Sequence, residues 1–161
     1  MGNINYTLGK DYLVFTDVDP KTTYFLQNWN GLGFTGGDVT SGSPYGPIYN
    51  PADIIIYNTF AATFIIDEDW KVFEQIQALA IKNAPLDGST YEATTTDINL
   101  YLMNNTYQKS VAYITMHDAY VQSIMNVENA YNVSDNTPPK TMTVIFKYQY
   151  HDFHRIEDEN I

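Results

Sequence analysis

A regular alternation of apolar and polar positions runs from Ile54 to Ile66. Six of the seven even-numbered positions in this stretch are apolar, whereas the odd-numbered positions include Tyr57, Thr59 and Thr63. A period of two places successive side chains on opposite faces of a strand. The pattern therefore predicts one long strand with one buried face and a second face that is partly covered.

The hydrophobic period changes at Asp67, and apolar residues then recur at the spacing of one helical face. Asp67 to Asp69 place acceptors and negative charge where a helix leaves its first amide groups unpaired, and Pro85 ends the pattern. The sequence thus predicts one amphipathic helix lying against a sheet, with Phe73 and Ile76 buried. The apolar stripe consists of Trp70, Phe73, Ile76 and Leu79.

Five further segments carry strand patterns. The first two are short, and the turn-forming residues Asp17, Asp19 and Pro20 lie between them, so they are predicted to form a hairpin. In the fourth segment the apolar positions change face near His117 and Asp118, which fits a β-bulge. The five segments are Asp11–Phe15, Thr22–Leu26, Asp97–Leu102, Val111–Met125 and Thr141–Tyr150.

These elements together favour a mainly β fold of about seven antiparallel strands with one α-helix. Two packed sheets (a β-sandwich) or a small barrel would suit the pattern, with the helix covering one open edge or end. A chain of 161 residues is about the size of one domain, and no linker divides it. Residues 1–161 are therefore predicted to form a single domain that ends in a flexible acidic tail at 154–161.

Residues 27–51 contain six Gly and three Pro and are predicted to form a long loop. The loop is unusually apolar for a segment surrounded by solvent, because it carries Trp29, Phe34, Tyr45 and Tyr49. We therefore expect it to contact a partner; the alternative is a flexible insertion without a function.

The charge balance limits the function classes. The chain has 8 basic and 19 acidic residues, a net charge of −11, which argues against a surface that grips nucleic acid. It has no cysteine, so disulfides and thiolate metal sites are impossible. No apolar run approaches the roughly 20 residues of a membrane helix, so no membrane anchoring is expected.

Two groups of residues could in principle carry catalysis. Asp67, Glu68 and Asp69 could act as paired carboxylates, but capping the helix explains them more simply. His151 and His154 could bind a metal or serve a small hydrolase, yet spacing specifies no third ligand. We therefore expect no enzymatic activity, no metal and no cofactor. The 14 tyrosines also leave open a carbohydrate-binding β-sandwich module.

Four stretches of the sequence resemble the tail tube proteins of bacteriophages and their baseplate tube-initiator relatives. The first, YNTFAATFIIDEDWKVFEQIQALA, corresponds to the strand-to-helix core of that family. Before it, GDVTSGSPYGPIYNPAD resembles the Gly/Pro loop that precedes this strand in relatives. The others are DINLYLMNNTYQKSVAYITMHDAYVQSIMNVENAY and the closing strand TMTVIFKYQY, and the likeness covers roughly Gly31 to Phe153. Met116 stands where that family has an aromatic residue, and the first hairpin is only weakly similar.

The resemblance implies a tail-tube-like fold and a structural role. Six copies would form a ring, and stacked rings would form the tail tube of a virion, the conduit for genome ejection. Double-stranded DNA would pass through without specific binding, and tail sheath, baseplate, terminator and tape measure proteins would be partners. Assembly would occur in the host cytoplasm. A tube-initiator or terminator role, and a contractile or non-contractile tail, stay open.

The exposed surface that a monomer would leave predicts where subunits or rings touch, because soluble monomers avoid unpaired strand edges and large apolar patches. The expected contacts come from the long loop and from the hairpin turn between the third and fourth of the five segments. The candidate contact residues are Trp29, Phe34, Tyr45, Tyr49, Asn104, Asn105 and Tyr107.

Overall fold

The computed structural model describes residues 11–15, 26–82, 95–104, 109–125, 127 and 139–156. Within these residues the chain forms nine strands and one helix. In order they are β1 (Tyr12–Phe15), β2 (Leu26–Asn30), β3 (Phe34–Ser43), β4 (Gly46–Tyr57), β5 (Phe60–Ile65), α1 (Lys71–Lys82), β6 (Thr96–Met103), β7 (Ser110–Ile124), β8 (Thr141–Lys147) and β9 (Tyr150–Arg155).

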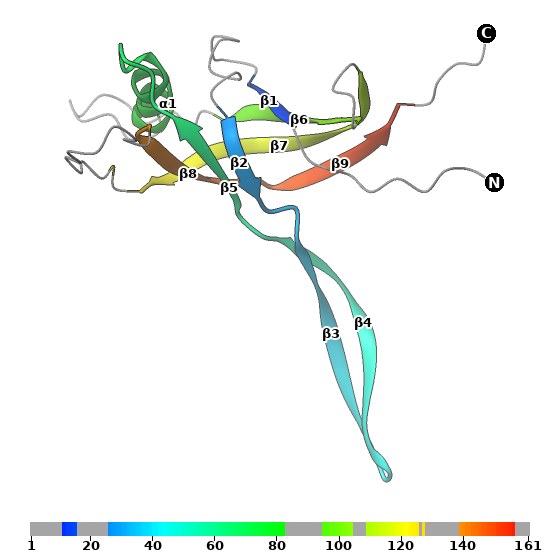
Figure 1. Ribbon diagram of the computed structural model, residues 1–161. Coiled ribbons are helices and arrows are strands. Elements are labelled where there is room, and N and C mark those ends of the chain that lie inside the picture. The colour runs from blue at the N-terminus through cyan, green and yellow to red at the C-terminus, as the bar shows by residue number, and fades with distance from the viewer. Residues whose placement is uncertain are drawn as a thin grey trace, which may run out of the picture.

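The strands form a compact body and a long two-stranded arm (Figure 1). The body is a seven-stranded sheet in the order β1-β6-β7-β8-β5-β2, with β9 also paired to β7. The arm, residues 34–57, is the separate β3–β4 ribbon. All strand pairs are antiparallel. The predicted mainly β fold with one helix is confirmed.

Strand β7 is long because it serves two sets of neighbours. Its first part pairs with β6 and β9, and its second part pairs with β8. Between the two parts, His117 and Asp118 stand opposite the single residue Asp97, and Asp118 has a φ of 53°. The predicted bulge is therefore present. The extra residue shifts the alternation of side chains by one position. Met116 and Ala119, which are three residues apart, therefore face the same side of the sheet and are both buried.

The core is a single cluster of apolar side chains from β1, β5, β6, β7, β8 and α1. Every second residue of β5 and β8 is buried, as their alternating sequences require. The helix adds Val72, Ile76 and Leu79, which confirms burial of Ile76, whereas Phe73 is only half-buried against the core. The largest fully buried side chains are Phe60, Phe64, Phe146, Leu13, Ile76, Ile98, Leu100, Met116, Met142 and Val144.

The helix begins at Lys71, four positions after the residue at which the sequence pattern changes. Trp70 has a φ of 58°, a left-handed conformation that cannot belong to a right-handed helix. The preceding residues form a turn, in which the Trp70 amide donates to the Asp67 carbonyl at 3.0 Å. Oδ1 of Asp67 accepts a hydrogen bond from the Val72 amide at 3.1 Å, which supports the capping interpretation.

Asp67→Ala is expected to lower the free energy of unfolding by about 1 kcal/mol, because the Val72 amide loses its acceptor. Chemical denaturation measures the change. Glu68→Ala is the matched control, since Glu68 is exposed, and its effect should stay within about 0.5 kcal/mol. Equal effects of the two substitutions would contradict the capping role.

The single strand predicted for 54–66 is wrong. The alternation continues, but the backbone leaves one sheet and enters another at Asn58 and Thr59. The Asn58 amide donates to the carbonyl of Gly33 at 2.9 Å, closing the root of the arm. The alternation of apolar residues could not reveal this break, because it does not indicate to which sheet each part of the segment belongs.

The long loop predicted for 27–51 is also wrong, since these residues form β2, β3 and the first part of β4. Glycine and proline are normally depleted in strands. Here each arm strand pairs with a neighbour on one side only. The missing backbone N–H of Pro47 or Pro51 therefore removes no hydrogen bond to a second neighbouring strand.

The predictions about the chain ends have different outcomes. β1 pairs with β6, and Leu26, the last residue of the second predicted segment, begins β2, which pairs with β5. The other residues of that segment, 22–25, lie outside the described residues, so the predicted first hairpin stays a prediction. The end of the last predicted strand and the start of the tail are wrong. The last predicted strand ends at Lys147, and β9 then includes His154 and Arg155, which were assigned to the flexible tail. The remaining tail residues at 157–161 lie outside the described residues.

Candidate functional site: the projecting arm

The arm extends well beyond the body (Figure 1). Strands β3 and β4 pair only with each other, so neither long edge of the ribbon has a strand partner within the described residues. A two-stranded ribbon without a third strand or a helix against it is marginally stable in water. Within the described residues, the arm is therefore stabilised only by the pairing of its two strands and by contacts at its root.

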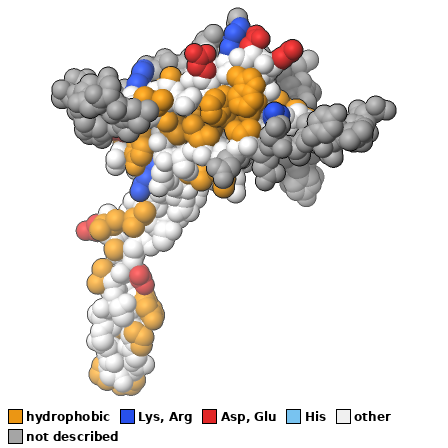
Figure 2. Space-filling model, turned by 90° about the vertical axis from the view of Figure 1, so that its left-hand side faces the viewer, with side chains coloured by type: hydrophobic (Ala, Val, Ile, Leu, Met, Phe, Trp, Pro, Cys, Tyr) orange, Lys and Arg blue, Asp and Glu red, His pale blue; other side chains and the backbone are white. Residues whose placement is uncertain are grey.

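The arm exposes an unusual amount of apolar surface. Within residues 34–57 only Ser43, Ala52 and Tyr57 are even partly buried. Figure 2 shows apolar side chains along the arm toward its tip. Soluble monomers seldom expose apolar area on this scale. The large apolar side chains that are at least 50% exposed here are Phe34, Val39, Tyr45, Ile48, Tyr49, Ile54, Ile55 and Ile56.

The arm also carries little charge. Asp38 and Asp53 are the charged residues of 34–57, and this segment contains no Lys or Arg. Exposed edge strands are usually protected from unwanted pairing by charged side chains, lysine above all. The centres of protein interfaces, in contrast, are poor in charge and rich in Tyr and Phe. The composition of the arm is that of an interface.

The tip of the arm is a tight turn that presents one aromatic side chain. The Ser43 hydroxyl donates to the Gly46 carbonyl at 2.7 Å, and the Tyr45 amide donates to Oγ of Ser43 at 3.3 Å. Gly46 has a φ of 125°, which L side chains rarely adopt. These bonds hold the turn while the side chain of Tyr45 is fully exposed.

The root of the arm rests on a cluster of four rings, which we call the aromatic seat: Phe34, Tyr57, Tyr148 and His151. Phe34 and Tyr57 form the first rung of the arm, with ring centroids 6.1 Å apart. Tyr57 meets the His151 ring edge-to-face at 4.8 Å and the Tyr148 ring at 5.9 Å. The Tyr148 hydroxyl lies 3.2 Å from Nδ1 of His151.

Burial changes the acidity of two groups in the seat. It raises the pKa of the Tyr148 hydroxyl, with a smaller contribution from Tyr57. It lowers the pKa of His151, although the neighbouring carboxylate of Asp152 acts in the opposite direction. Both shifts favour the neutral form of the group concerned.

The chain approaches the arm through a close contact at Gly31. A Cβ atom on this residue would lie 2.8 Å from Cδ2 and 3.0 Å from Cα of Phe60, and Gly31 has a φ of 156°. Gly31→Ala is therefore expected to cost about 1–3 kcal/mol of unfolding free energy, measured by chemical denaturation. Gly36→Ala is the control, because a Cβ there meets nothing within 4 Å. A Gly31→Ala variant as stable as that control would contradict the contact.

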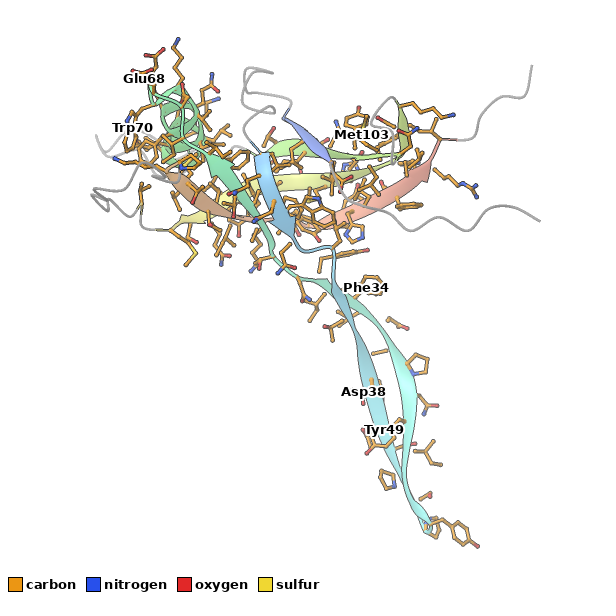
Figure 3. All side chains as sticks on the ribbon, viewed as in Figure 1. Phe34, Asp38, Tyr49, Glu68, Trp70 and Met103 are labelled. Atoms are coloured by element: carbon orange, nitrogen blue, oxygen red, sulfur yellow. The ribbon has the colours of Figure 1, made fainter. Side chains whose placement is uncertain are left out.

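Three of the predicted contact residues lie on the arm. Phe34 is at its root and Tyr49 lies on its distal part, as Figure 3 shows, and Tyr45 is in the tip turn. All three are exposed. Their part in subunit contacts stays a prediction.

The other predicted contact residues do not lie on the arm. Trp29, on β2, stacks on Phe60 at 5.8 Å, and its indole N–H donates to Asp11 at 3.0 Å, so it contributes to packing of the body. Asn104 follows β6, where its amide donates to the Lys109 carbonyl at 3.1 Å. The remaining two, Asn105 and Tyr107, lie outside the described residues.

Sequence reasoning missed part of this surface. Ile54, Ile55 and Ile56 were assigned to a half-buried strand, yet all three are exposed on the arm. The sequence did contain one indication that this segment is not half-buried. Three consecutive isoleucines place apolar side chains on both faces of a strand. The seat residues Tyr57 and His151 carried no comparable signal.

The histidines do not form a metal site. His151 pairs in register with Met116 and His154 with Tyr113, so the two imidazoles lie on opposite faces of β9 and cannot converge. His117 lies between two carboxylates, 2.8 Å from Asp152 and 3.6 Å from Asp97. Across the described ranges, no group of three or more His, Asp or Glu side chains could hold a metal ion.

No helix in the described part of the chain could span a membrane. Helix α1 is too short and too polar to cross a bilayer.

Comparison with known proteins identifies the fold of this chain. No family model matches the sequence, and no curated protein matches it significantly. Among solved structures, a chain from the tube-terminating cap of the anti-feeding prophage aligns with a TM-score of 0.69 and 10% identity, covering 97% of this chain and 96% of that one. This chain has the tail-tube fold.

Two further structures share the tail-tube fold. A chain from the sheath/tube terminator of an extracellular contractile injection system (PVC) aligns with a TM-score of 0.67 and 10% identity, covering 94% of this chain and 98% of that one. A chain from the sheath–tube complex of the same system aligns with a TM-score of 0.65 and 9% identity, covering 92% and 90%. The sequence resemblance to tail tube proteins is thus confirmed at the level of fold.

Proposed function

We propose that this protein is a structural subunit of a tail-tube-type assembly, and that the arm joins one ring of subunits to the next. The observation that carries the proposal is the arm itself. On a tail-tube fold, a ribbon that is apolar, almost uncharged and without strand partners in the described residues is suited to contact a second copy. No catalytic activity is proposed.

The ring is proposed to contain six copies, as the resemblance to phage tail tube proteins implies. Strands β1, β2 and β9 each have one side without a strand partner among the described residues. Exposed strand edges of this kind pair readily with neighbouring chains. Pairing of the body between adjacent copies, and contacts of the arm between rings, would cover both kinds of unpaired surface.

The assembly is proposed to be the tail tube of a virion or of a related contractile injection device. In a virion it would be assembled in the host cytoplasm and would conduct DNA during genome ejection. The net charge of −11 supports passage without adhesion, since an acidic wall repels phosphate. Sheath, baseplate, terminator and tape measure proteins are the proposed partners.

A second candidate function is that of a ring that ends or begins the tube. Two of the aligned structures are described as a tube-terminating cap and a sheath/tube terminator. Such a protein would form rings that attach to a tube without stacking extensively on one another. The discriminating result is therefore the length of the assemblies that the purified chain forms.

Sedimentation velocity and negative-stain electron microscopy of the purified full chain test the proposal. We expect rings at low concentration and stacked rings or tubes at high concentration. Single rings at every concentration would favour the terminator or initiator role. A monomer at all concentrations, particularly one that binds ligands on a glycan array, would overturn the proposal and favour a carbohydrate-binding module.

A further inference from the structure

The two strands of the arm present different outer edges. In the ribbon, Pro47 stands opposite Gly42 and Pro51 stands opposite Asp38. Proline has no backbone N–H, and within a sheet it occupies positions whose N–H side faces away from the partner strand. In an antiparallel pair, two residues that stand opposite each other at such a position both direct their backbone groups outward. Gly42 and Asp38, with Thr40 between them, therefore direct their N–H and C=O groups to the free edge of β3.

This arrangement leaves one edge of the arm able to pair and protects the other. On β4, Pro47 and Pro51 have no N–H to donate to a further strand. On β3, the outward residues Asp38, Thr40 and Gly42 all have one, and all three are exposed. Proline on an edge is a known protection against strand pairing. A further strand can therefore add to the arm along β3 but not along β4.

Strand β9 offers a matching edge on the body. The Ile156 amide donates to the Val111 carbonyl at 2.9 Å, so Ile156 directs its backbone groups toward β7. Since this direction alternates along a strand, Arg155, Phe153 and His151 direct their backbone groups away from β7. Within the described residues β9 pairs with β7 alone. The free edge of β9 thus has three outward residues at the same spacing as those on β3.

We infer that the arm docks by strand addition, and that β3 of one copy pairs antiparallel with β9 of a copy in the next ring. This inference rests on the proposed function and specifies the surface that receives the arm. The arm does not pair with β9 of its own chain, because it leaves the body at its root, and Asp38 lies farther out than Phe34 (Figure 3). In the inferred register Asp38 stands opposite Arg155, Thr40 opposite Phe153, and Gly42 opposite His151.

The charges of the two edges are complementary in this register. Asp38 is one of two charged residues on the arm, and both are acidic. Arg155 is the only arginine of the chain, and it is exposed. Within the described part of the chain, neither Asp38 nor Arg155 has an ion-pair partner. A guanidinium group holds a carboxylate through two parallel hydrogen bonds, so the contact would pair both charges.

The other two opposed pairs also fit. Thr40 opposite Phe153 joins a β-branched residue to an aromatic one, which is a favourable cross-strand pair. Tyr49 stands opposite Thr40 in the ribbon, so Tyr49 and Phe153 would lie in one row on the same face of the extended sheet. They are 66% and 60% exposed in the single chain, and this row would cover both. Gly42 has no side chain, which leaves room for the ring of His151 in the aromatic seat.

The first test is a disulfide between two chains, since the protein has no cysteine of its own. One full-length chain carries Thr40→Cys and another carries Phe153→Cys, and the two are mixed, assembled and mildly oxidised. Opposed residues of such a pair have Cα atoms about 5.5 Å apart, within the range of a disulfide. We expect a covalent dimer joined through positions 40 and 153, identified by mass spectrometry. In the control, Asn50→Cys replaces Thr40→Cys; Asn50 is exposed on β4, one strand farther from β9, and should not link.

The second test removes the central backbone donor of the β3 edge. Thr40→Pro lacks the outward N–H but takes no hydrogen bond from the ribbon itself. It should raise the concentration at which rings stack by at least about tenfold, measured by sedimentation velocity, while single rings still form. Thr40→Val keeps the N–H and should stack far more readily than Thr40→Pro.

A third test exchanges the charges. Asp38→Arg and Arg155→Asp should each weaken stacking, because like charges then face each other across the contact. Combined in one chain, they should restore stacking, since each carboxylate again faces a guanidinium.

Several outcomes would overturn the inference while tubes still support the proposed function. These are a disulfide between two Thr40→Cys chains or between two Phe153→Cys chains in place of the mixed one, stacking that Thr40→Pro does not weaken, and charge reversals that do not rescue each other. The mixed disulfide in small oligomers that never form rings would instead support docking of β3 on β9 and refute the tube.

Discussion

Tyr45→Asp combined with Tyr49→Asp is expected to abolish ring stacking while leaving the fold of the body intact. Tyr45 is fully exposed and Tyr49 is 66% exposed, so neither substitution removes packing from the isolated subunit. In a stacked assembly each new carboxylate would be buried in an apolar contact without a partner, which costs several kcal/mol per group. The cost would repeat in every subunit of a ring, so tubes should disappear from electron micrographs while the sedimentation of single rings is unchanged.

Tyr45→Phe combined with Tyr49→Phe is the matched control for this variant. It keeps both rings and adds no charge, so tubes should still form. Tubes of wild-type length from the double Asp variant would show that the distal arm does not join the rings. Loss of the rings themselves would show instead that the arm acts within a ring.

Phe60→Ala is expected to lower the free energy of unfolding by about 3–5 kcal/mol, the largest stability effect we predict. Phe60 is completely buried where β2, β5 and β8 meet, stacked on Trp29 at 5.8 Å and 6.5 Å from Phe146. Truncation removes transfer free energy and leaves a cavity that three packed strands cannot close. Chemical denaturation in the Tyr45→Asp, Tyr49→Asp background measures the effect without a contribution from assembly.

Phe153→Ala is the control, because Phe153 is 60% exposed on β9. Its unfolding free energy should change by no more than about 0.5 kcal/mol. A loss below about 1 kcal/mol for Phe60→Ala would mean that β2 and β5 do not pack as described.

The sequence predicted the body better than the arm, because the body has one buried face and one solvent face. Alternation located β6, β7 and β8, and the phase change at His117 revealed the bulge. Helical spacing located α1 and its buried residue Ile76. These signals are local, since each depends only on which residues of one segment are apolar.

The arm could not be predicted in this way, because its residues have no interior to face. Ile54–Ile56 continue the alternation of β5 although they belong to another sheet, and only the turn at Asn58 separates the two. Glycine and proline suggested a loop, whereas a two-stranded ribbon tolerates both. The start of α1 was misplaced for a similar reason, since the left-handed conformation of Trp70 leaves no trace in the pattern.

The sequence singled out Phe34, Tyr45 and Tyr49 as contact residues, because they are apolar residues within a glycine- and proline-rich stretch. The structure places all three at exposed positions of the arm, and their role in contacts stays a prediction. The aromatic seat joins residues from β3, β4 and β9 that are far apart in the sequence. Such a cluster depends on long-range packing, which the pattern of a single segment does not contain.

A cryo-electron microscopy reconstruction of the assembled wild-type protein tests the central claim most directly, because it shows where the arm lies. We predict six-fold rings in which every arm crosses to the adjacent ring and buries Tyr45 and Tyr49 against it. Rings that stack through their bodies alone, with the arms projecting into solvent, would contradict the account.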